Sequence, residues 1–148
     1  MTIVVGVDGS DGSIGALRFA REEARIRGVE IKVVNAWHIP PGIYGSGWTA
    51  TQVDLDEYRK LAEKALAASV EEAGIADSGV EVTTILREGH AADVLCDEAT
   101  SADLLVVGSR GLGGFRGLLL GSVSQQVVQH APCPVVVVPG HHTDDKQD

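Results

Sequence analysis

Five short runs of aliphatic, mostly β-branched residues recur along the chain, and the spacing between them leaves room for a helix or a long loop. The first, fourth and fifth runs are continuously apolar instead of alternating between apolar and polar residues, which is typical of strands that are buried on both faces. A chain with this pattern is expected to form a parallel sheet between two layers of helices. The five predicted strands are Ile3–Val7, Ile31–Ala36, Val80–Leu86, Leu104–Val107 and Val135–Val138.

Helical patterns lie between these runs. Ser10 or Asp11 is expected to cap a first helix that stops at Gly28. A longer apolar stripe begins near Leu55, after a segment rich in glycine and proline, and ends at Gly74. A short helix is predicted over residues 91–100, and Ser122 opens the last one.

The alternation of strands and helices predicts an α/β fold: a single Rossmann-like domain over residues 1–140, with a doubly wound, mostly parallel five-stranded sheet and helices on both faces. The polar residues 141–148 are predicted to form a disordered tail. In doubly wound sheets ligands bind beyond the carboxyl ends of the strands. The loops after Val7, Ala36 and Val107 are therefore the expected site.

Composition excludes several classes of function. The net charge of −9 argues against nucleic-acid binding, which needs a basic surface. No apolar run approaches the roughly 20 residues of a membrane helix, and no secretory leader precedes the first strand, so we expect a cytoplasmic protein without membrane contact. Cys96 and Cys133 lack metal-ligand spacing and are expected to be free thiols. His38, His90 and His130 have no nucleophile at a recognisable spacing, so no catalytic residue is predicted.

Acidic residues are absent from one long segment of this acidic protein. All 21 carboxylates lie outside the stretch from Leu104 to Thr143, which contains Arg110 and Arg116. An anion site favours such a distribution. Buried strands and helices would also leave a segment poor in charge, and the sequence alone does not separate the two explanations.

Glycines mark the loop and helix start that follow the fourth strand. Two residues separate Gly108 from Gly111, and nine more precede Gly121 and Ser122. Glycine admits positive φ and lets backbone N–H groups reach an anion, and the start of a helix adds unpaired donors. None of the four lysines follows a glycine, which excludes a Walker loop, and Arg116 stands where a dinucleotide fingerprint needs its third glycine.

This glycine spacing resembles the ATP-binding signature of the universal stress protein family. The resemblance extends to Val4-Val5-Gly6-Val7-Asp8-Gly9-Ser10 at the start, to Asn35-Ala36-Trp37, and to Gly89-His90-Ala91. It implies an adenine-nucleotide-binding version of the fold, with ATP as the ligand. The charge of the phosphates leads us to expect Mg²⁺ or Mn²⁺ beside them.

The resemblance also implies roles for individual residues. Val7 and Asp8 would approach the ribose and adenine, and Ala36 would offer backbone hydrogen bonds to the adenine edge. The phosphates would be held by Gly108, Gly111, Gly121, Ser122 and Val123. Arg110 is a further candidate phosphate contact. Asp8 has an alternative role in a turn, Ser122 as a helix cap, and Arg110 as an exposed loop residue.

The predicted function is a stress-response or regulatory protein that binds ATP and hydrolyses it slowly or not at all, because no base or metal-ligand set accompanies the loop. Alternatives are a binder of AMP or cyclic AMP, an ATP-dependent adenylating enzyme of related fold, or a nucleotide-free dimeric module. If the strand order follows the family, Val135–Val138 is an edge strand, and its unpaired backbone predicts a homodimer by edge pairing.

Overall fold

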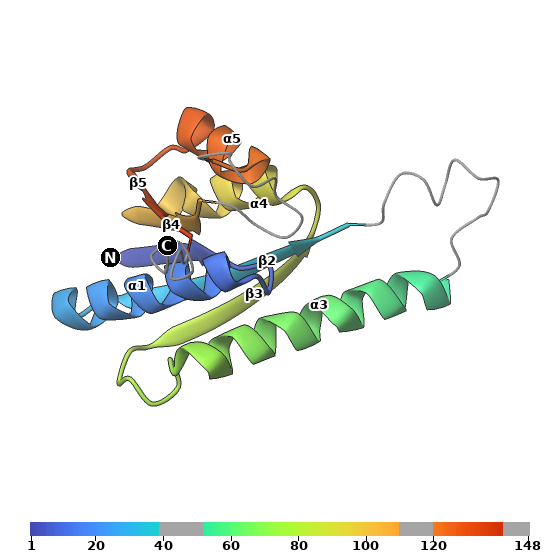
Figure 1. Ribbon diagram of the computed structural model, residues 1–148, viewed down its shortest axis with the longest axis horizontal. Coiled ribbons are helices and arrows are strands. Elements are labelled where there is room, and N and C mark those ends of the chain that lie inside the picture. The colour runs from blue at the N-terminus through green and yellow to red at the C-terminus, as the bar shows by residue number, and fades with distance from the viewer. Residues whose placement is uncertain (39–51, 110–119, 141–148) are drawn as a thin grey trace, which may run out of the picture.

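The computed structural model describes residues 1–38, 52–109 and 120–140, and these form one parallel sheet with a helical layer on each face (Figure 1). The strands are β1 Thr2–Gly6, β2 Glu30–Trp37, β3 Val82–Glu88, β4 Leu104–Gly108 and β5 Val135–Val138. The helices are α1 Asp11–Arg27, α3 Gln52–Ala73, α4 Ala91–Glu98 and α5 Ser122–His130, with a 3₁₀ turn η1 at Ala99–Ser101. The predicted fold class is confirmed.

The strands lie in the order β3-β2-β1-β4-β5, and every neighbouring pair is parallel. From β1 the chain builds outward to β2 and β3, and it then returns to the other side of β1 to build β4 and β5. The strand order therefore reverses between β1 and β4, which is where ligands of such sheets bind. As expected, β5 lies at an edge of the sheet.

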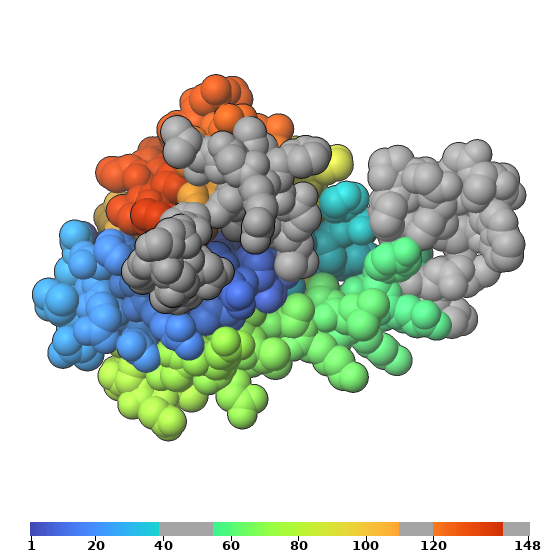
Figure 2. Space-filling model, viewed as in Figure 1, coloured from blue at the N-terminus to red at the C-terminus, as the bar shows by residue number. Residues whose placement is uncertain are grey.

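Alternate residues of the central strands enter two separate cores. On one face α1 and α3 pack on Val5, Val33 and Val106, and on the other face α4 and α5 pack on Val34 and Leu105. Both faces of β1 and β4 are thus buried along their central residues, which explains why these runs are continuously apolar. In Figure 2 the surface of α1 lies between those of α3 and of the β5–α5 region.

The ends of the elements follow the capping chemistry expected from the sequence. Ser10 caps α1 by accepting a hydrogen bond from the Ser13 N–H at 3.2 Å, and Gly28 ends this helix with φ 67°. Gly74, with φ 70°, follows α3. The third strand begins two residues later than predicted, at Val82, because Val80 still belongs to the preceding turn, where its N–H donates to Ser78 Oγ at 3.2 Å.

Gly108, the last residue of β4, lies against Gly12 in the first turn of α1. A Cβ at this position would stand 2.8 Å from the Gly12 carbonyl oxygen and 2.9 Å from its carbon, so no side chain fits without moving the start of α1. Positive φ does not explain this glycine, nor Gly121, whose φ is −80°. The sequence-based argument from φ is wrong for these two residues; at Gly108 it is helix–strand contact that demands glycine.

We predict that Gly108→Ala lowers the free energy of unfolding by about 1–3 kcal/mol, the usual cost of overpacking. Urea denaturation followed by circular dichroism measures the change. Gly15→Ala is the matched control, because its Cβ would meet Val138 Cγ1 at an ordinary 3.9 Å and alanine favours the helix. Equal stability of the two variants would contradict this account of Gly108.

Candidate functional site at the carboxyl edge of the sheet

The candidate site lies at the carboxyl ends of β1, β2 and β4, around the point where the strand order reverses. Three described segments meet there: the turn after β1, the last residues of β2, and Ser109 with the start of α5. These segments contain most of the residues predicted from the sequence. Arg110 and Gly111 lie outside the described residues.

The turn after β1 is held by short-range hydrogen bonds. Asp8 Oδ1 accepts from the Ser10 N–H at 2.9 Å, while the Asp8 N–H donates to Ser13 Oγ at 3.2 Å. Gly9, with φ 87°, allows the chain to turn into α1. Asp8 therefore has the turn role that the sequence left open, and its half-buried carboxylate lies at the switch point. Contact with a ribose stays a prediction.

Ala36 lies near the end of β2. The ladder between β1 and β2 ends two residues earlier, where Gly6 pairs with Val34. In a parallel strand, alternate residues direct their backbone groups to opposite neighbours. The Val34 carbonyl accepts from the Val7 N–H at 2.9 Å on the β1 side, and the Trp37 carbonyl accepts from the Gly89 N–H at 2.8 Å on the β3 side. By this alternation Ala36 directs its N–H and carbonyl to the β1 side, past the last residue of β1. Such an edge can pair with a planar donor–acceptor group such as adenine.

Ser109 is a buried residue that ties three elements together. Its N–H donates to the Val138 carbonyl at 2.8 Å, and its Oγ accepts from the Gly140 N–H at 3.0 Å. Its carbonyl accepts from the Gly121 N–H at 2.6 Å and from Ser124 Oγ at 2.7 Å. Ser109 thus fixes the ends of β4 and β5 against the start of α5.

The sequence reasoning did not single out Ser109 or Ser124. Ser109 stands inside the glycine motif, and Ser124 is a polar residue followed three positions later by the buried Val127. Those positions were the available signals. The pattern did not show that both residues would be buried, with Ser124 Oγ donating to the Ser109 carbonyl and Ser109 Oγ accepting from the Gly140 N–H.

The first turn of α5 offers backbone donors to an anion. The first N–H groups of an α-helix have no acceptor within the helix, and the helix dipole places partial positive charge there. Ser122 and Val123 are exposed in this turn, which has no acidic residue and no side-chain cap. The Gly121 N–H is already bonded to Ser109, so the donors left for a ligand in this turn are those that follow it.

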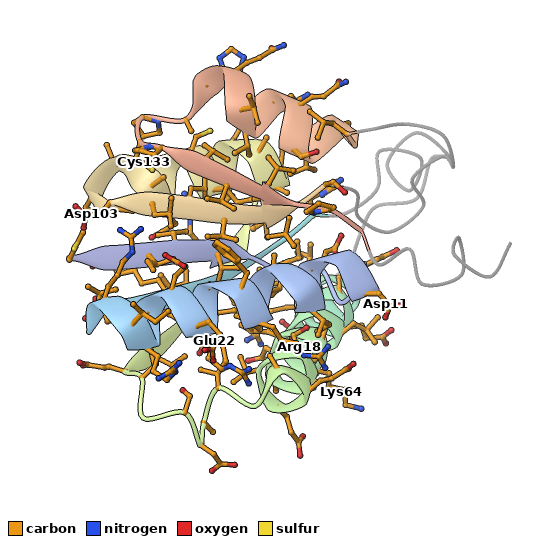
Figure 3. All side chains as sticks on the ribbon, turned by 60° about the vertical axis from the view of Figure 1, so that its left-hand side comes forward. Asp11, Arg18, Glu22, Lys64, Asp103 and Cys133 are labelled. Carbon is orange, nitrogen blue, oxygen red and sulfur yellow. The ribbon has the colours of Figure 1, made fainter. Side chains whose placement is uncertain are left out.

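The two thiols lie elsewhere. Cys133 precedes β5 and lies with Asp103 at the amino end of the strands, opposite the end where Asp11 starts α1 (Figure 3). Burial raises the pKa of both thiols, with Asp93 adding to the effect at Cys96 and Asp103 at Cys133. Raised pKa values keep the thiols protonated near neutral pH, so neither is an activated nucleophile.

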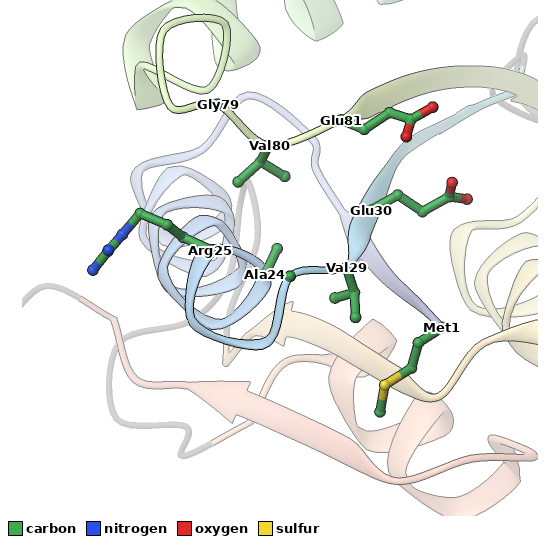
Figure 4. A pocket seen from close by; sticks show the side chains of 9 residues that line it. Met1, Ala24, Arg25, Val29, Glu30, Gly79, Val80 and Glu81 are labelled. Atoms are coloured by element: carbon green, nitrogen blue, oxygen red, sulfur yellow. The ribbon is translucent and has the colours of Figure 1, made fainter.

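A pocket of about 470 Å³ opens at the opposite, amino edge of the sheet (Figure 4). Met1, Arg25 and Glu30 line it, with Glu81 near the start of β3. Two carboxylates make this pocket a poor host for phosphates. It is also far from the switch point, so we place the candidate site at the carboxyl edge instead.

Across the described ranges, no group of three or more histidine, cysteine or acidic side chains is arranged to hold a metal ion. Among the same residues, no helix has the length and apolar character needed to cross a membrane.

Comparison with known proteins shows relatives along nearly the whole chain. A universal stress protein of Thermus aquaticus is 35% identical over 139 residues, which cover 93% of this chain and 97% of that protein. A universal stress protein of Mycolicibacterium smegmatis is 37% identical over 142 residues, or 93% of this chain. The chain spans only 45% of the length of that second relative.

Two solved structures with similar folds carry bound nucleotides. One is the universal stress protein of Archaeoglobus fulgidus in complex with dAMP, which is 34% identical, has a TM-score of 0.65, and is matched over 93% of this chain and 97% of its own. The other is a universal stress protein in complex with cAMP, 32% identical with a TM-score of 0.67, matched over 93% and 96%. The universal stress protein family model matches residues 1–139. The chain belongs to the universal stress protein family.

Proposed function

We propose that this chain is a cytoplasmic regulatory protein of the stress response that binds ATP at the carboxyl edge of its sheet and hydrolyses it slowly or not at all. The observation that carries the proposal is the placement of two complementary features beside the switch point. The backbone of Ala36 offers a hydrogen-bonding edge for the base, and the first turn of α5 offers donors for the phosphates.

The remaining predicted contacts fit between these two features. Val7 and Asp8 lie at the end of β1, between β2 and β4, where a ribose would join the base to the phosphates. Gly108 and Gly121 serve mainly through their contacts with Gly12 and Ser109, while Ser122 and Val123 would donate to phosphate oxygens. Gly111 and Arg110 are proposed to complete the phosphate site, together with Mg²⁺ or Mn²⁺.

A nucleoside monophosphate is the second candidate ligand. It is favoured by the two relatives whose structures hold dAMP and cAMP, since both have only one phosphate. The base and ribose contacts would be the same for either ligand. The two candidates differ only in how many phosphates the region around α5 must accommodate.

We predict that Ser122→Asp weakens ATP binding by about tenfold or more, because a carboxylate beside the phosphates costs at least about 1.4 kcal/mol of binding free energy. The same carboxylate suits the start of a helix, so the protein should remain folded. Calorimetric titration of nucleotide-free protein with ATP, AMP, cyclic AMP and adenosine measures the effect. Adenosine, without phosphate, should bind both proteins equally.

Gln129→Asp is the control, because it introduces the same charge on the same helix but in the last turn. Its affinity for ATP should match that of the unaltered protein. Failure of all three nucleotides to bind would refute the proposed function. Equal weakening by both aspartates would show a general charge effect and would remove the phosphates from the start of α5.

We also propose a homodimer formed by pairing of β5 with its copy. The Pro134 carbonyl accepts a hydrogen bond from the N–H of Leu105 in β4, and the Val138 carbonyl accepts one from the N–H of Ser109, which follows β4. Val135 and Val137 therefore direct their backbone groups away from β4, to the open edge.

Val137→Pro should convert the dimer to a monomer, because it removes an N–H that faces the open edge and leaves the β4–β5 hydrogen bonds in place. Val137→Thr keeps that N–H and nearly the same shape, and should remain dimeric. Sedimentation equilibrium at micromolar concentration measures both masses. A monomeric mass for the unaltered protein would contradict the proposed dimer.

A further inference from the structure

We propose that His38 and His90 form a binding site for a divalent late transition-metal ion, such as Ni²⁺ or Zn²⁺, at the carboxyl ends of β2 and β3. Their ring centres lie 4.9 Å apart, although the two residues are 52 positions apart in the sequence. The proposal does not depend on nucleotide binding, and it involves imidazole nitrogen instead of phosphate oxygen.

The backbone holds the two histidines in fixed relative positions. Trp37 pairs with Glu88 in the β2–β3 ladder, and the next bond runs from the Gly89 N–H to the Trp37 carbonyl at 2.8 Å. Each histidine follows directly after one partner of that bond. His90 is also tied to α4, because its carbonyl accepts from the Val94 N–H at 3.0 Å.

Gly89 makes this approach possible. Its φ of 144° is a conformation that side chains rarely adopt, and a Cβ there would lie 3.1 Å from Val94 Cγ2. The turn from β3 into α4 at Gly89 therefore places His90 beside the end of β2. A site whose ligands are positioned before the metal arrives loses less entropy on binding.

The separation of the rings fits a shared metal ion. A zinc ion about 2.1 Å from one nitrogen of each ring lies about 3.2 Å from each ring centre, so a tetrahedral angle at the metal separates the centres by about 5.2 Å and a right angle by about 4.5 Å. The observed 4.9 Å lies between these values. The planes are tilted by 48°, as opposed to the near-parallel arrangement of stacked rings.

Both side chains are exposed, so an ion can reach them and water can fill its other coordination positions. Within the described part of the chain no third histidine, cysteine or carboxylate completes a metal cluster. Selectivity then follows from imidazole alone, which favours Ni²⁺, Cu²⁺ and Zn²⁺ over Mg²⁺.

The test uses the full chain with His130→Ala, His141→Ala and His142→Ala, which removes the three other histidines. Calorimetric titration of this chelator-treated protein with Ni²⁺ should show one ion per chain, and Mg²⁺ should show none. Adding His38→Gln or His90→Asn should weaken Ni²⁺ binding by about tenfold or more, because one ligand of a chelating pair is lost. Asparagine at position 90 preserves a good helix cap.

Nuclear magnetic resonance provides a second readout that needs no variant at positions 38 or 90. In the unaltered protein, substoichiometric Ni²⁺ should broaden the imidazole resonances of both His38 and His90. Unchanged affinity when both are replaced, broadening confined to other histidines, or no binding in the triple-alanine protein would each overturn the proposal.

Discussion

The buried hydrogen bonds of Ser109 are the interactions on which the carboxyl edge of this sheet depends. One residue joins β4, the end of β5 and the start of α5 through four hydrogen bonds, to Val138, Gly140, Gly121 and Ser124. Each such bond contributes on the order of 1 kcal/mol, but a greater cost would come from leaving its buried partners unpaired. The first turn of α5 is thereby held beside the strand-order reversal between β1 and β4. That placement turns an ordinary helix start into a candidate anion site.

The second constraint is the close contact of α1 with β4. Gly108 has no room for a Cβ because the Gly12 carbonyl lies against it, and Ser10, Ser13 and Asp8 bond one another to shape the turn before the helix. Gly108 and Asp8, which the sequence suggests as ligand contacts, therefore also stabilise the fold. The consequence is that substitutions in the motif report on folding as well as on binding, so only a change such as Ser122→Asp, which suits the helix, separates the two.

Much of the architecture could be predicted because its causes are local or periodic. Buried parallel strands need largely apolar runs, and Ser10 begins a helix while Gly28 and Gly74 end helices by chemistry that needs no tertiary information. The features that could not be predicted from the sequence depend on contacts across the fold. The roles of Ser109 and Ser124, the packing reason for Gly108, and the approach of His38 to His90 all arise between residues distant in the chain. The sequence predicts a doubly wound sheet, and therefore a reversal of the strand order. The position of that reversal, between β1 and β4, is seen in the assembled sheet (Figure 1).

The central claim is that an adenine nucleotide lies across the carboxyl ends of β2, β1 and β4, and a residue-level map of binding tests it most directly. Amide resonances of the ¹⁵N-labelled protein should be followed while ATP is added. The account predicts that the largest shifts occur at Val7, Asp8 and Ala36 and in the first turn of α5, with Met1, Val29 and Gly79 at the amino edge unaffected. Shifts gathered around the amino-edge pocket of Figure 4, or none at the end of β2, would contradict it.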